Sequence, residues 1–156
     1  VASKFDEFFS LAATADKRLR LLSSGGELLA ETSDFASPLL GLDARPRASE
    51  ADTFEVLVTS MGGEVVLLLL RRPRDGAGDW GFEVAQRFRD HAKHCSAARF
   101  APAAAHGEGA NERSDPVESM ATGGDHFVTI SRDHTARLYR RASPGAEFAP
   151  AGVVRL

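Results

Sequence analysis

The chain has 156 residues, of which 43% are hydrophobic and 26% charged, values typical of a globular protein with a core of its own. A formal net charge of −3 excludes a polyanion binder held by overall charge, although a local basic patch is compatible with it. The single cysteine, Cys95, excludes an internal disulfide, and the longest apolar run, residues 65–70, is far shorter than the ~20 residues of a membrane helix. We therefore expect no membrane span and an intracellular location, cytoplasmic or nuclear.

The first part of the chain predicts three short strands. Residues 8–13 and 18–23 flank a turn at Asp16, and the Gly25-Gly26 pair then leads into a strand over residues 27–31. Short apolar runs separated by tight turns are typical of neighbouring antiparallel strands.

The middle of the chain predicts four strands. The first covers residues 39–44, with Leu40 and Leu42 facing inward, and a polar turn with Pro46 follows over residues 45–52. The other three are expected at residues 54–59, 64–70 and 80–88. The sequence VVLLLL at residues 65–70 is apolar on both faces, which predicts a strand buried between neighbours.

The last part begins with a polar connection at residues 89–95 and a short strand at residues 96–100. Residues 101–124 are rich in Ala, Gly, Pro and Glu without any period, which predicts a disordered insertion. Residues 127–141 then predict a strand, a turn centred on Asp133 and a second strand. A final strand over residues 147–156 is expected to be broken by Pro150.

Three of these strand–turn–strand units share one layout, with Asp16, Gly62 and Asp133 at the turn. Asp16 and Gly62 lie 46 positions apart, and Gly62 and Asp133 lie 71 apart, or 47 without the 24 residues of the insertion. This spacing is close to the ~40–45 residues of a four-stranded propeller blade. The sequence therefore predicts repeated antiparallel sheets.

The third unit also resembles a known family in its motifs. Asp90-His91 resembles the Gly-His that opens a WD repeat, residues 131–135 (SRDHT) resemble its Asp-centred turn, and residues 137–139 (RLY) resemble its Arg-Leu-Trp. The chain is thus similar to the WD-repeat β-propeller family. The resemblance implies an all-β fold of four-stranded antiparallel blades, about three of them in an incomplete ring. The blades would cover about residues 1–33, 34–89 and 90–156.

The resemblance further implies a buried hydrogen-bond network in which a His, a strand hydroxyl, the turn Asp and an aromatic residue take part. The matching positions are His91, Thr129 or Ser131, Asp133 and Tyr139, with Thr135 closing the turn. The first unit keeps only the turn residue, Asp16, and has Leu22 at the aromatic position, while the second unit lacks both the Asp and the aromatic.

Propellers typically close with ~4–8 blades, more than the chain supplies. The chain also begins with Val1 rather than Met. We therefore expect a piece of a longer protein, or a ring whose remaining blades come from a partner or from a second copy.

A narrower similarity is to the non-catalytic WD-repeat subunits of tRNA guanine-N7 methyltransferases, on the matching positions Lys17, Arg18, Arg132 and Asp133. It implies contact with tRNA through a partner. The candidate binding residues are the basic ones near the turns: Lys17, Arg18, Arg20, Arg132 and Arg137. The alternative is that these are solvated side chains, neutralised by nearby carboxylates.

No catalytic group or cofactor motif is recognisable. His91, His94 and Cys95 have a spacing that could bind a metal, but no further ligand follows, so a polar turn with His91 held by Asp133 is the preferred interpretation. The sequence therefore predicts a non-catalytic scaffold for protein–protein interaction in a larger assembly, without a cofactor. The alternative is an RNA-associated subunit of a tRNA methyltransferase complex.

Overall fold

The structure is a computed structural model, which describes residues 9–73, 78–101 and 125–156; every regular element in these ranges is a β-strand. No helix long and apolar enough for a membrane crossing occurs among these residues. The disordered insertion predicted for residues 101–124 lies, apart from Ala101, outside the described residues.

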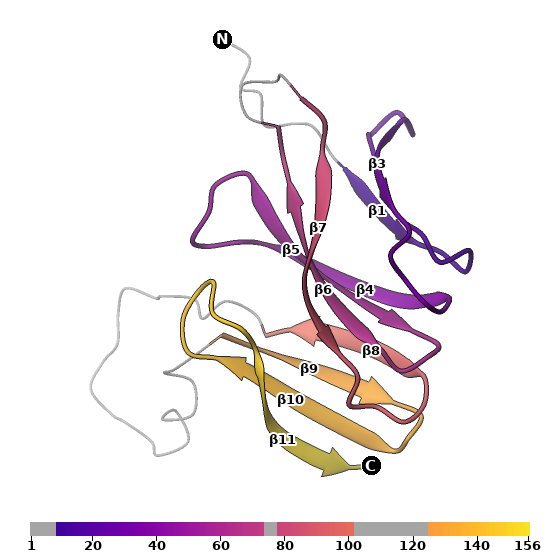
Figure 1. The fold of residues 1–156 in the computed structure, drawn as a ribbon, viewed down its shortest axis with the longest axis vertical. Coiled ribbons are helices and arrows are strands. Elements are labelled where there is room, and N and C mark those ends of the chain that lie inside the picture. Colours follow the sequence, from indigo (N-terminus) through magenta and orange to yellow (C-terminus); the bar gives the residue numbers. More distant parts are fainter. Residues whose placement is uncertain (1–8, 74–77, 102–124) are drawn as a thin grey trace, which may run out of the picture.

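Within the described ranges the strands form three antiparallel sheets, and inside each sheet a strand pairs with the next one along the chain (Figure 1). The first sheet consists of β1 (Ser10–Ala13), β2 (Leu19–Leu22) and β3 (Leu28–Thr32). The second consists of β4 (Leu39–Pro46), β5 (Thr53–Ser60), β6 (Val65–Arg71) and β7 (Gly81–Phe88). The third consists of β8 (Cys95–Phe100), β9 (Asp125–Ser131), β10 (Thr135–Arg141) and β11 (Ala149–Arg155). The predicted all-β fold of antiparallel blades, about three in number, is confirmed.

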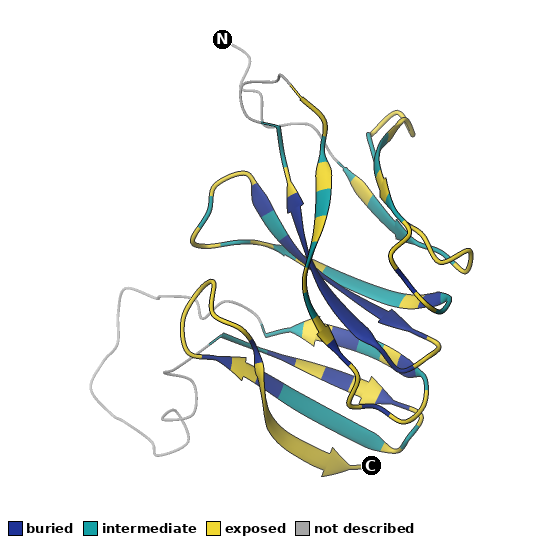
Figure 2. Ribbon diagram, viewed as in Figure 1, coloured by how far each residue is buried: buried dark blue, intermediate teal, exposed yellow. Residues whose placement is uncertain are grey.

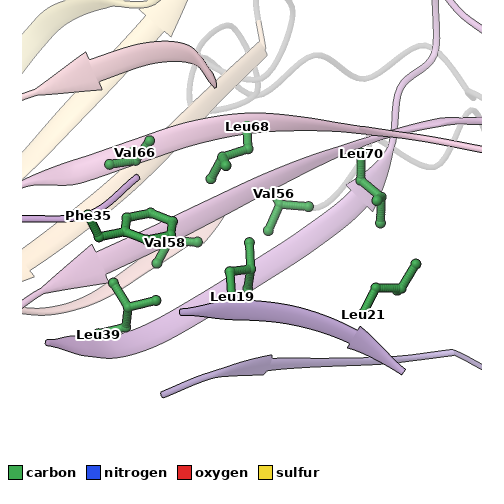
Figure 3. Packing of buried hydrophobic residues seen from close by; sticks show 9 residues of the cluster. All are labelled: Leu19, Leu21, Phe35, Leu39, Val56, Val58, Val66, Leu68 and Leu70. Carbon is green, nitrogen blue, oxygen red and sulfur yellow. The ribbon is translucent and has the colours of Figure 1, made fainter. Parts of the chain in front are cut away.

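The core lies on both faces of the second sheet, and β6 contributes to each side (Figure 2). Its side chains Val66, Leu68 and Leu70 pack toward the first sheet, where they meet Leu19 and Leu21 (Figure 3). The alternate residues of β6 face the third sheet, because side chains alternate along a strand. All residues from 65 to 70 are buried, so the prediction of a strand enclosed between neighbours is confirmed.

Two predictions about the fourth strand were wrong. β4 continues through Pro46, so Arg45 belongs to the strand and not to the predicted turn; Pro46 is tolerated because β4 is an edge strand and Pro46 is its last residue. Leu40 is 46% exposed, whereas Leu39 is buried. The reason is a β-bulge between Leu39 and Gly41, which shifts the register by one residue and turns Leu40 outward.

Pro150 does not end a strand, as the sequence predicts, but it lies at an irregularity. β11 runs through Pro150, and the register against β10 shifts directly after it, since Tyr139 pairs with Pro150 and Leu138 with Gly152. β11 is the outer strand of the third sheet, where a missing backbone N–H leaves no neighbour unsatisfied.

Candidate functional site

Five connections between strands lie at the same end of the three sheets, because successive antiparallel strands reverse direction (Figure 1). We call this end the turn rim, defined by residues 14–18, 33–38, 61–64, 89–94 and 132–134. Backbone hydrogen bonds join its segments: Leu39 N donates to Thr14 O (3.3 Å), Met61 N to Pro38 O (2.9 Å) and Arg132 N to His94 O (2.9 Å). The rim is therefore one connected surface along all three sheets.

A buried network built around His91 supports the rim at the third sheet. The ring nitrogen Nδ1 of His91 lies 2.9 Å from Asp133 Oδ2, and Nε2 lies 2.7 Å from Thr129 Oγ1. Asp133 also accepts hydrogen bonds from the backbone N–H of Ala92 (3.1 Å) and from both the N–H and the hydroxyl of Thr135 (2.9 and 2.6 Å). The network thus ties the loop between β7 and β8 to the turn between β9 and β10.

These contacts stabilise the charged form of Asp133. Partial burial of the carboxyl acts to raise its pKa, but the hydrogen bonds from Thr135, His91 and the Ala92 N–H outweigh this and hold the pKa well below the ordinary value. The Asp133 carboxylate is therefore charged, and both of its oxygens take part in hydrogen bonds that hold the structure together.

The other two residues that the resemblance placed in the network have different partners. Ser131 Oγ donates to Lys93 O and accepts from the Asp133 N–H, both at 3.1 Å, so Thr129 and not Ser131 is the strand hydroxyl that contacts His91. The hydroxyl of Tyr139 donates to Asp90 Oδ2 at 2.8 Å. Burial and the Asp90 charge raise the pKa of Tyr139, so the phenol stays protonated and holds the residue next to His91 in place.

Replacing Asp133 with alanine is expected to lower the free energy of unfolding by about 1–3 kcal/mol, because it leaves His91 without its partner in a buried position. The pKa of Asp133 is depressed in the folded state, so its contribution is complete above the ordinary value of 3.8 and is lost as the pH falls below it. Urea unfolding at pH 7 and pH 3 should show a smaller difference between variant and wild type at pH 3.

The matched control for this prediction is Arg132→Ala at the neighbouring exposed position, expected to stay within ±0.5 kcal/mol of the wild type. Equal stability of the Asp133 variant and the wild type at pH 7 would contradict the role of the network.

At the first sheet, the predicted binding residues Arg18 and Arg20 form ion pairs with carboxylates. Glu31 accepts hydrogen bonds from both, with Arg20 Nε at 2.8 Å, and Arg20 also lies 2.6 Å from Asp16. Hydrogen bonds from Arg20 and from Thr14 lower the pKa of Asp16 to about 2. This part of the rim is consequently close to neutral, as the alternative interpretation of the sequence expects.

The remaining predicted binding residues do not gather into one patch. Lys17 is exposed at the turn between β1 and β2, with a positive φ of 65°. Arg137 lies partly buried in the middle of β10, where its Nε has no hydrogen-bond partner among the described residues. Arg132 is exposed on the turn rim at the third sheet.

Arg132 lines a shallow pocket of about 550 Å³ between the second and third sheets. Its walls come from the turn between β5 and β6, the loop between β7 and β8 and the turn between β9 and β10. The lining residues are Met61, Gly62, Ala92, Lys93, His94 and Arg132. No local pattern in the sequence predicts this pocket, because its lining residues are separated by up to 71 positions. Only the repeat, which places equivalent turns side by side, could have indicated it.

His91 and Cys95, whose spacing could bind a metal, form other contacts in the structure. His91 belongs to the network, and the Cys95 thiol is buried, contacting the carbonyl oxygens of Ala97 (3.6 Å) and Ile130 (3.5 Å). Burial raises the pKa of Cys95 to about 11, so the thiol is neutral and a poor nucleophile. No group of three or more His, Cys, Asp or Glu side chains in the described part of the chain is placed to hold a metal ion.

An ionic cluster joins the second and third sheets, and the sequence did not predict it. Arg141 on β10 donates to both oxygens of Glu55 on β5, at 2.5 and 3.0 Å, and Arg45 on β4 donates to Glu55 Oε2 at 2.8 Å. Asp125 pairs with both arginines, and burial, which would raise its pKa, is outweighed by these partners, so the pKa is lowered. The two positive and two negative charges balance, which identifies the cluster as a structural joint between the sheets.

Comparisons with known proteins agree with this architecture. No protein-family model matches the sequence, and no curated protein matches it. Among solved structures, the crystal structure of the WD40 domain of SCAP from fission yeast is similar, with a TM-score of 0.57 and 12% sequence identity. The match covers 88% of this chain and 28% of that chain. The chain therefore has a WD40-like β-propeller fold.

Proposed function

We propose that the chain is a non-catalytic scaffold that binds protein partners of a larger assembly through its turn rim. The observation that supports this most is the rigidity of the rim: the His91 network and the backbone bonds between its segments hold the turns in place. Turns held on a rigid sheet framework are where recognition residues are usually found.

The side chains with shifted pKa values also favour a scaffold over an enzyme. Asp133, Tyr139 and Cys95 are each engaged in contacts that hold strands or turns together. Active sites instead keep a titratable group poised in a pocket that a substrate can reach.

Chemical cross-linking of the native assembly tests the proposal. The two lysines in the described part of the chain, Lys17 and Lys93, both lie on the turn rim. Purification after treatment with an amine-reactive cross-linker should yield peptides that join these lysines to a partner protein. As a control, a carboxyl-reactive cross-linker reports on Glu50 and Glu147 at the opposite end of the sheets. Cross-links to partners from that end alone would contradict the assignment to the turn rim.

The alternative, an RNA-associated subunit of a tRNA guanine-N7 methyltransferase complex, stays a prediction. Lys17, Lys93 and Arg132 favour it, since they are exposed cations on one rim without an ion pair among the described residues. The pairing of Arg18 and Arg20 with carboxylates weakens it. Co-purification with a methyltransferase, and tRNA retention that falls steeply with salt, would support this function.

We also propose that further blades cover the outer face of the third sheet. The third sheet has an exposed apolar face that includes Val128, Ile130 and Val154, with exposed fractions of 38%, 45% and 62%. Such a face favours coverage by another blade, supplied by a longer chain, a partner or a second copy. Light scattering of the purified protein, alone and with its partners, distinguishes these sources.

A further inference from the structure

The pocket between the second and third sheets has an unusual balance of charge. Lys93 and Arg132 are exposed, and neither forms an ion pair with a described residue; His94 also belongs to the lining. The turn between β5 and β6 contributes Met61, which is 41% exposed and supplies an apolar thioether. The pocket therefore combines cationic groups with one apolar contact.

The carboxylates near this pocket direct their oxygens to other groups, and none of them forms an ion pair with Lys93 or Arg132 among the described residues. Asp133 is bound to His91 and Thr135. The others are Glu64, which pairs with Arg87 (3.2 Å) and Arg89 (2.9 Å), and Asp90, which accepts from Tyr139. The side-chain N–H groups of Lys93 and Arg132 thus have no carboxylate partner in the described part of the chain and can pair with a ligand.

The backbone around the pocket is fixed before any ligand arrives. The carbonyl of Lys93 accepts from Ser131 Oγ at 3.1 Å, and the carbonyl of His94 accepts from the Arg132 N–H at 2.9 Å. Gly63 has a φ of +83° and packs so closely that a Cβ there would lie 2.6 Å from the carbonyl oxygens of His91 and Lys93. A preorganised pocket loses little conformational entropy on binding.

We propose that this pocket binds an acidic segment of a protein partner, whose carboxylates pair with Lys93 and Arg132 while a neighbouring apolar side chain packs on Met61. The inference rests on the proposed scaffold function and specifies the chemistry of one partner. The guanidinium of Arg132 can form two parallel hydrogen bonds to one carboxylate. Such a contact is specific in its geometry and also attracts the carboxylate by its charge.

An acidic peptide fits the pocket better than RNA does. A nucleic-acid backbone is bound by a track of cations along its length. The other rim cations do not continue such a track, because Arg18 is paired with Glu31 and Arg89 with Glu64, which leaves Lys17 alone at the first sheet. Met61 also offers an aliphatic contact that suits a Leu or Ile side chain rather than a stacked base.

Fluorescence anisotropy with defined probes tests the inference on the full chain. The probes are a short labelled peptide of glutamates around a central leucine, the same peptide with lysines for glutamates, and a single-stranded oligouridine. The variants are Arg132→Glu, the double variant Lys93→Glu with Arg132→Glu, and Met61→Ser. The matched control is Arg140→Glu, an exposed arginine on the same strand pair but at the other end. Thermal unfolding of each variant verifies that it is folded.

The wild type is expected to bind the glutamate peptide in a salt-sensitive manner and to ignore the lysine peptide. Arg132→Glu should weaken binding by about tenfold and the double variant further, while Arg140→Glu stays within about twofold of the wild type. Equal affinity of all folded variants, or tighter binding of oligouridine with the same dependence on Arg132, would overturn the inference. If the peptide does not bind as expected while lysine cross-links to a partner protein are still found, the scaffold function is supported. Only the proposal that the pocket binds an acidic segment is then contradicted.

Discussion

Replacing Glu55 with alanine is expected to lower the free energy of unfolding by about 3–5 kcal/mol. Glu55 is 1% exposed and binds Arg141, which is 5% exposed, so the variant leaves the buried guanidinium of Arg141 with Asp125 as its one remaining carboxylate among the described residues. Arg45 loses the same partner, so a single carboxylate, Asp125, is left to balance two guanidinium groups. Chemical denaturation at pH 7 with the intact chain measures the loss.

A double variant separates the charge effect from simple loss of packing. Glu55→Leu combined with Arg141→Met removes both buried charges and leaves Arg45 and Asp125 as a balanced pair. Replacing a buried ion pair with apolar side chains of similar volume is often neutral or stabilising, so this variant should be clearly more stable than Glu55→Ala. If the two variants are equally unstable, the cost arises from packing and not from the excess positive charge.

Replacing Phe127 with alanine is expected to cost about 3–5 kcal/mol. The Phe127 ring is fully buried and stacks on Tyr139, with ring centroids 4.8 Å apart and an interplanar angle of 14°. It also meets Phe88 and Phe148 edge-on, at 5.2 and 4.9 Å. These rings come from both the second and the third sheet, so the cavity would open at the contact between them.

Val128→Ala is the matched control for Phe127→Ala. Val128 is the next residue on β9 but points to the other face of the third sheet, where it is 38% exposed. Its loss should change the free energy of unfolding by no more than about 0.5 kcal/mol. Similar effects of the two substitutions would mean that the two faces of the sheet are not as different as the burial indicates.

The strands could be predicted from the sequence because their signals are local. The apolar run at residues 65–70 predicts a strand enclosed on both faces, and the structure confirms this. Where a bulge intervenes, alternation assigns the wrong residue to the core, as happened with Leu40 and Leu39. The position of a bulge depends on the pairing with the partner strand, and no residue within β4 predicts it.

The site was less predictable, because its contacts join distant parts of the chain. Glu55 and Arg141 are 86 positions apart, and the polar pattern around Arg45 predicts a turn there, so no local signal indicates the ionic cluster. The pairing of Arg20 with Glu31 is different, since the two residues are cross-strand partners in a hairpin. The strand register of this hairpin places Glu31 directly opposite Arg20. Working out that register from the sequence would have shown that this arginine forms an ion pair with a carboxylate.

The two-sided burial of β6 has a consequence for how the chain unfolds. In an array of repeats, each unit can often melt by itself, with stability close to a sum over neighbours. Here removal of the first sheet would expose Val66, Leu68 and Leu70, and removal of the third would expose Val65 and Leu67 on the same strand. The three sheets should therefore melt in a single cooperative transition, and a truncation at either sheet boundary should yield an aggregating product instead of a smaller stable domain.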